Sequence, residues 1–149
     1  MNSWHSATGQ ELKTIIPARA LIEKEHIETE FRSASGIVNG QGEYIAGAVL
    51  ITAGYSTDGK YSHFLTTEVS LKIGALRLRP GEYALGYRHN KNGLDVTFYE
   101  TESGKLLGHV EAIRRTQSGK LESFRINCDG DHGRVEIGRF GIPYKICPP

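Results

Sequence analysis

The fold is decided by residues 83–137, which read YALGYRHNKNGLDVTFYETESGKLLGHVEAIRRTQSGKLESFRINCDGDHGRVEI. Four turn signals divide this stretch. Asn92-Gly93 is typical of a two-residue type I′ hairpin, in which both central residues need positive φ. Glu102-Ser103-Gly104 and Gln117-Ser118-Gly119 each predict a three-residue loop closed by a left-handed glycine, and residues 130–133 predict a four-residue loop. The spacing of these turns predicts five successive antiparallel strands.

The predicted register agrees with the apolar pattern of the strands. A slip of one residue would move every side chain to the opposite face, so the agreement is informative. The residues that the turns set opposite each other are almost all apolar, which indicates one continuous core face and a C-terminal five-strand meander. The predicted pairs are Phe98 with Tyr87, Val96 with Val110, Leu94 with Ala112, Ala112 with Phe124, Val110 with Ile126, Gly108 with Cys128, Ile126 with Ile137, and Cys128 with Val135.

Polar side chains occupy the opposite face of the same strands in two rows. Directly opposed side chains in antiparallel strands lie about 4.5–5.5 Å apart at Cβ, so each row is a strip of neighbours. The first row is Arg88, Thr97, His109, Asn127 and Glu136, and the second is Asn90, Asp95, Glu111, Arg125 and Gly138. The candidate ligand-binding residues are therefore Arg88, Asp95, His109, Glu111, Arg125, Asn127 and Glu136.

Two interpretations of these rows stay open. In the first, the rows form a solvated sheet face in which Arg125 bridges Glu111, because polar outer faces are usual for antiparallel sheets. In the second, Asp95, Glu111 and His109 bind a ligand or a divalent cation, or share a proton. Burial distinguishes them, since a covered face with shifted pKa values favours a functional site. We expect the solvated face and no resident metal ion.

The N-terminal part of the chain is less regular. Residues 1–11 contain no hydrophobic run, so we expect a flexible end followed by one β domain over residues 12–149. Residues 17–32 are compatible with a helix that starts near Pro17 or with a strand. Alternation of apolar and polar residues favours a strand from residue 27 to 33.

Two further segments predict strands in the middle of the structure. Residues 43–53 are apolar on both faces, which is typical of a strand buried on both sides. Residues 62–73 alternate in polarity and predict one long strand. Together with the C-terminal turns, these segments predict an all-β antiparallel sandwich or irregular barrel of about eight or nine strands.

The stretch Leu78-Arg-Pro-Gly-Glu-Tyr83 contains a turn signal. Pro80 presets φ at its position and Gly81 supplies the positive φ that a type II turn needs next. The stretch resembles the Leu-x-Pro-Gly-x-Tyr turn of many bacterial β-sandwich modules of the transthyretin or carboxypeptidase-regulatory kind. This resemblance implies a β-sandwich of bacterial origin, and it implies no site residue.

Composition and charge limit the class of partner. The chain has 149 residues, of which 38% are hydrophobic, enough for one sizeable core. Its net charge is +1, without the strong basic excess of nucleic-acid-binding domains, so we expect no nucleic-acid partner. No apolar run approaches the ~18 residues of a membrane span. We expect an extracytoplasmic location if a leader has been trimmed, and a cytoplasmic one otherwise.

The sequence contains no motif that specifies a reaction. Residues 129–133 lack the remaining ligand positions of a calcium loop, and the six histidines are scattered. We expect Cys128 and Cys147 to be unpaired in either of two arrangements of the C-terminus. If Gly141 begins a new strand, residues 133–140 form a strand between the cysteines; if Gly141 is a bulge in one long strand, Cys147 lies far along that strand. Both arrangements hold the cysteines too far apart for a disulfide.

We therefore expect a non-catalytic binding or accessory domain without a cofactor, whose partner is an unidentified protein or small molecule. The alternative is a small enzyme or ligand-holding β-barrel that uses the polar face around His109, Glu111 and Asp95.

Overall fold

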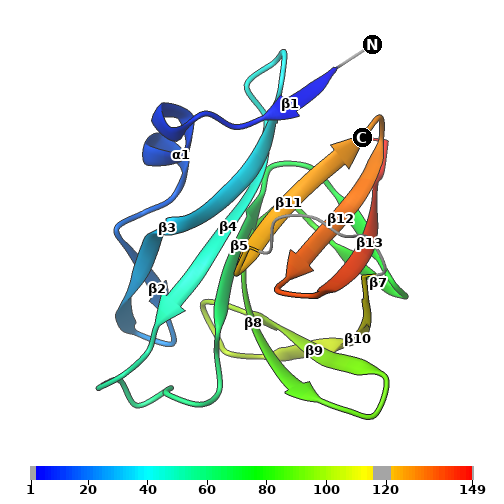
Figure 1. The fold of residues 1–149 in the computed structure, drawn as a ribbon. Helices are drawn as coiled ribbons and strands as arrows, with labels where there is room; N and C mark the ends of the chain where they lie inside the picture. Colours follow the sequence, from blue (N-terminus) through cyan, green and yellow to red (C-terminus); the bar gives the residue numbers. More distant parts are fainter. Residues whose placement is uncertain (1–2, 116–121, 149) are drawn as a thin grey trace.

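The structure, a computed structural model, describes residues 3–115 and 122–148. These residues form an antiparallel sheet of 13 strands that curls into a nearly closed barrel, with a short helix outside it (Figure 1). The predicted all-β antiparallel fold is confirmed, whereas the predicted number of about eight or nine strands is too low. The elements are β1 (Trp4–Ser6), α1 (Gly9–Ile15), β2 (Arg19–Ile22), β3 (Glu25–Asn39), β4 (Tyr44–Ile51), β5 (His63–Thr67), β6 (Leu71–Ile73), β7 (Leu76–Leu78), β8 (Gly81–His89), β9 (Gly93–Glu100), β10 (Leu106–Arg114), β11 (Phe124–Asp129), β12 (His132–Ile137) and β13 (Phe140–Ile146).

The barrel closes between β11 and the pair formed by β3 and β4. Neighbouring strands follow the order β1-β3-β4-β5-β8-β9-β10-β13-β12-β11, with β2 beside β3 and the β6–β7 hairpin beside β13. At the seam, Ile126 of β11 donates its backbone N–H to the hydroxyl of Ser35 in β3, at 3.0 Å. Next to this bond, the ring of Phe124 lies against Gly47 of β4. These contacts join the two ends of the strand path.

Two apolar clusters cover both faces of β4. Side chains at alternate positions point into the barrel and fill it, among them Ile37, Ile45, Leu65, Leu85, Val96, Phe98, Ile126 and Ile142. A smaller cluster on the outer face of β4, β5 and β8 is covered by α1 and the β2–β3 hairpin, and it includes Leu12, Ile22, Ile27, Ala48 and Phe64. The prediction that residues 43–53 hold a strand buried on both sides is confirmed.

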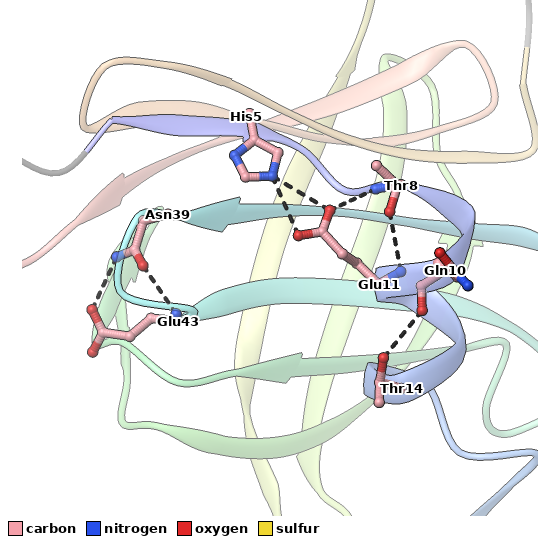
Figure 2. Close-up of polar contacts among 7 residues, drawn as sticks. All are labelled: His5, Thr8, Gln10, Glu11, Thr14, Asn39 and Glu43. Atoms are coloured by element: carbon pink, nitrogen blue, oxygen red, sulfur yellow. Dashed lines mark hydrogen bonds and ion pairs between the residues drawn. The ribbon is translucent and has the colours of Figure 1, made fainter.

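The N-terminal stretch is folded onto the barrel. β1 pairs with the end of β3. Helix α1 begins with a capping box, in which the Thr8 hydroxyl accepts the N–H of Glu11 and the Glu11 carboxylate accepts the N–H of Thr8 (Figure 2). His5 of β1 lies 3.4 Å from the same carboxylate. The flexible end expected for residues 1–11 is therefore wrong for residues 4–11.

The β8–β9 hairpin is shifted by two residues from the predicted register. Tyr87 lies opposite Val96, so the predicted pair of Phe98 with Tyr87 is wrong. The cause is the side chain of Asn90, which accepts two backbone N–H groups within the turn at 2.8 and 2.9 Å. The backbone N–H of Asn90 donates to the carbonyl of Gly93 at 2.9 Å, so the turn lies at Lys91-Asn92 instead of Asn92-Gly93.

The β11–β12 hairpin is shifted in the same way. Asp129 pairs with His132, which leaves a two-residue loop, so Ile126 lies opposite Val135. The predicted pairs of Ile126 with Ile137 and of Cys128 with Val135 are therefore wrong. A shift by two residues keeps every side chain on its predicted face.

The last strands do not follow the predicted meander. β10 pairs with β9 as predicted, with Val96 opposite Val110 and Leu94 opposite Ala112. On its other side, β10 pairs with β13, and β11 lies at the far end of the path. The loop predicted at Gln117-Ser118-Gly119 lies outside the described residues. The pairs predicted between β10 and β11 are wrong, namely Ala112 with Phe124, Val110 with Ile126, and Gly108 with Cys128.

Of the strands predicted for residues 27–33 and 62–73, the first is confirmed and the second is wrong in its length. Residues 27–33 lie within β3, which confirms a strand there. Residues 62–73 form two strands instead of one, because the chain turns after β5. The Thr67 hydroxyl stabilises this turn by donating to the carbonyl of Val69 at 2.7 Å.

We predict that alanine at Gly47 opens the barrel seam. A Cβ at this position would overlap the backbone carbonyl oxygen of Phe64 in β5 and lie 2.9 Å from Cζ of Phe124 in β11, so β5 and β11 would both have to move. Gly47→Ala should lower the free energy of unfolding by about 1–3 kcal/mol, measured by urea denaturation. Gly40→Ala is the matched control, because a Cβ there meets no atom within 4 Å. Equal effects of the two substitutions would contradict this account of the seam.

Candidate functional site

One end of the barrel is open and forms a hollow of about 640 Å³. The hollow lies between the end of β4, the start of β5, the β8–β9 hairpin and the β12–β13 turn. It is termed here the barrel mouth. The side chains and backbone that line it include Val49, Leu50, His63, Gly86, Tyr87, His89, Leu94, Ile137 and Phe140.

Strand alternation explains why these side chains converge. His63 is two residues from Leu65, and Tyr87 is two residues from Leu85, and both leucines are fully buried in the barrel core. Because successive side chains of a strand point to opposite faces, His63 and Tyr87 point to the inner side as well. Phe140 packs against the same core cluster from β13. The barrel mouth is thus the place where the interior filling of the barrel ends.

Five aromatic rings form a continuous row, in which four line the barrel mouth and the fifth, Phe124, is buried next to His63. Ring centroids are 5.3 Å apart for Phe124 and His63, 6.1 Å for His63 and Tyr87, 5.8 Å for Tyr87 and His89, and 6.0 Å for His89 and Phe140. All four distances fall within the range of interacting aromatic pairs. The row runs over β11, β5, β8 and β13, so strands distant in sequence build it together.

His63 is the buried titratable group of the row. Only 4% of the residue is exposed. Burial lowers its pKa to about 4, because desolvation disfavours the charged imidazolium. The hydroxyl of Ser62 lies 2.7 Å from Nδ1. At neutral pH, His63 is therefore an uncharged polar group within aromatic surroundings.

Charged side chains lie at the rim of the barrel mouth. Asp58 accepts a hydrogen bond from the Thr52 hydroxyl at 2.9 Å. The Lys60 ammonium lies 3.3 Å from the Glu23 carboxylate. Arg139 is exposed in the β12–β13 turn. The rim is charged, whereas the surface inside it is aromatic and aliphatic.

The opposite end of the barrel carries a second hollow, of about 770 Å³. Trp4, three carboxylates and Lys145 are among its lining residues. One of the carboxylates, Glu43, is already bonded to Asn39 in the β3–β4 turn (Figure 2). We take the barrel mouth as the candidate site, because it combines a ring-lined hollow with a buried histidine.

Five residues of the predicted polar rows lie together on the outer face of the barrel. Asp95 lies opposite Glu111 of β10 and opposite Arg88 of β8. The Thr97 hydroxyl lies 2.9 Å from Nδ1 of His109, and Asp95 lies 3.8 Å from the same nitrogen. The side chains of His109 and Asp95 are 55% and 46% exposed. This face is open to solvent.

The other three predicted site residues lie elsewhere, because β11 does not pair with β10. Arg125 lies opposite Glu136, which is buried and is 3.4 Å from Arg115 and 3.6 Å from Arg134. Asn127 accepts the backbone N–H of Arg134 at 2.8 Å. The predicted contacts of Arg125 and Asn127 with β10 are therefore wrong.

The sequence contained one signal for the barrel mouth that the predictions did not use. His63 is in phase with Leu65, so an imidazole stands on the apolar face of residues 62–73. The position of Phe140 gave no such signal, because it depends on the pairing of β13 with β10.

Comparison of the chain with protein-family models, with curated proteins and with solved structures finds no match. Within residues 3–115 and 122–148, no group of three or more His, Cys, Asp or Glu side chains is placed to hold a metal ion. Cys128 and Cys147 are both free thiols, as predicted. In the same part of the chain, no helix has the length and apolar character needed to cross a membrane.

We predict that His63 makes the protein less stable in acid. Its pKa is about 4 in the folded state against 6.5 as the ordinary value. Between these values the unfolded chain binds the proton and the folded chain does not. The free energy of unfolding should therefore fall as the pH falls from about 6.5 to about 4, by about 3 kcal/mol from this group.

Urea denaturation at several pH values between 7 and 4 measures this effect. His63→Phe should flatten the pH dependence over that window. His132→Gln is the control, because His132 is exposed in the β11–β12 hairpin. If the free energy of unfolding of His63→Phe depends on pH as it does in the unchanged protein, the prediction is wrong.

We predict that Glu111→Arg is neutral or mildly stabilising. Asp95 lies opposite the like charge of Glu111, so the substitution replaces repulsion with attraction, worth at most about 1 kcal/mol on an exposed face. Chemical denaturation at low salt should show the gain, and 1 M salt should remove it. A clear loss of stability at low salt would show that Glu111 has an attractive partner.

Proposed function

We propose that this chain is a non-catalytic binding domain that holds a small, planar, largely apolar molecule in the barrel mouth. The observation that carries the proposal is the row of five rings that includes the buried His63. Ligand sites are generally concave and mostly apolar, contain a few placed polar groups, and occur in the mouths of β-barrels. The barrel mouth has these properties.

The size of the barrel mouth and its exposed rings favour an aromatic ligand. Its volume of about 640 Å³ is within the range of small-molecule sites. Tyr87 is 42% exposed although it lies within the ring row, and His89 is exposed as well. A planar ligand would cover this apolar surface and extend the offset or edge-to-face contacts that the rings already make.

The alternative site is the outer face around His109, Glu111 and Asp95, used by a small enzyme or a ligand-holding barrel. Its exposure weakens this alternative, because water and salt screen the charges there. The near-neutral net charge of +1 also favours a small molecule or a protein as partner over a nucleic acid.

We predict that the barrel mouth binds 2-methoxynaphthalene, a planar probe without a hydrogen-bond donor. Titration followed by ¹H–¹⁵N NMR should shift the signals of His63, Tyr87, His89 and Phe140. Tyr87→Ala removes a half-exposed ring and should weaken binding at least about fivefold. His109→Ala, on the outer face, should leave the affinity unchanged. No binding, or signal shifts confined to the outer face, would overturn the proposal.

A further inference from the structure

We infer that the ligand of the barrel mouth is a planar aromatic molecule with an O–H or N–H group at its edge, which donates a hydrogen bond to Nε2 of His63. The inference rests on the proposed function and adds the chemical group that the site recognises. It follows from the hydrogen bonds that fix the ring proton of His63.

The hydroxyl of Ser62 determines which ring nitrogen of His63 carries the proton. Its oxygen lies 3.1 Å from the carbonyl oxygen of Leu85 and 2.7 Å from Nδ1 of His63. A carbonyl oxygen only accepts, so the first contact is a hydrogen bond when the hydroxyl donates its single proton there. The hydroxyl oxygen then accepts from Nδ1, which must carry the ring proton.

The opposite arrangement satisfies only one of the two contacts. If the Ser62 hydroxyl donated to Nδ1, lone pairs of the Ser62 and Leu85 oxygens would face each other at 3.1 Å. The backbone N–H of Ser62 also donates to the Leu85 carbonyl, at 2.7 Å, which holds the hydroxyl in this place. The local geometry therefore selects the tautomer with the proton on Nδ1.

Nε2 of His63 is consequently an acceptor without a partner among the described residues. The residue is only 4% exposed, and the rings of Phe124 and Tyr87 lie 5.3 and 6.1 Å from its ring. Because His63 lines the barrel mouth, a partner can reach it from there. Nε2 is not among the fully buried side-chain atoms that lack a partner, so it is open to a group from the hollow. A ligand that covers Nε2 without a donor leaves the acceptor unsatisfied, whereas a ligand that supplies the donor satisfies it.

This arrangement discriminates between ligands of the same shape. A phenol or an N–H heterocycle presents a donor to Nε2. An ether or a carboxylate presents lone pairs, which repel those of Nε2. Burial keeps the pKa of His63 low, so the ring remains an acceptor at neutral pH.

The test compares 2-naphthol with 2-methoxynaphthalene, which share the ring system and differ in the donor. At pH 7 we expect 2-naphthol to bind the unchanged protein about fivefold more tightly. His63→Phe keeps a ring and removes the acceptor, so the ratio of the affinities for 2-naphthol and for the ether should fall to about one. If both probes bind equally to the unchanged protein, the inference is wrong and the proposed function stands. If neither binds, the proposed function itself is wrong.

Two further measurements keep the inference testable if His63→Phe does not fold. Long-range ¹H–¹⁵N NMR on the unchanged protein should place the ring proton of His63 on Nδ1, and a proton on Nε2 would overturn the inference. Ser62→Ala removes the group that fixes the tautomer, so the ratio of the affinities for 2-naphthol and for the ether should fall toward one. An undiminished preference would show that Ser62 does not set it.

Discussion

The ring of Phe124 lies against Gly47 where β11 meets β4, and the hydroxyl of Ser35 accepts the N–H of Ile126 beside it. A strand path that fails to meet leaves two edges with unpaired backbone groups. Here no ladder joins β11 to β3 or β4 among the described residues, and β11 instead packs against them, because Gly47 has no side chain and leaves room for the ring. Phe124 is also the first ring of the row in the barrel mouth, 5.3 Å from His63. One side chain therefore closes the barrel and shapes the candidate site.

Closure confines a ligand to the ends of the barrel. The interior is filled by large side chains that are fully buried, such as Phe98, Leu65 and Leu85. These side chains occupy the space that a ligand inside the barrel would need. Where this filling ends, inward-pointing positions continue for one or two residues along β5 and β8. These positions carry His63, Tyr87 and His89, and they become the wall of the barrel mouth. The same alternation that builds the core thus supplies the site.

The sequence predicts features that depend on neighbouring residues better than features that depend on contacts between distant segments. Side-chain alternation is local, so the all-β class and the inward residues of β8 to β12 were correct. Register depends on the turns, and the side chain of Asn90 helps to place one of them at Lys91-Asn92 through hydrogen bonds that the Asn92-Gly93 signal does not show. The order of the last strands is a long-range property, and local turn signals do not contain it. The barrel mouth includes the contact of Phe140 in β13 with His89 in β8. The complete set of its lining residues could therefore not be predicted from the sequence.

The β2–β3 turn shows how distant segments hold the rim of the barrel mouth in place. Glu23 and Lys24 adopt φ of 49° and 75°, which is unfavourable for residues other than glycine. The carboxylate of Glu23 offsets this cost by accepting hydrogen bonds from the Tyr61 hydroxyl and the Lys60 ammonium. Both donors belong to the loop that leads into Ser62 and His63. The strained turn therefore anchors the segment that sets the position, and through Ser62 the tautomer, of the buried histidine.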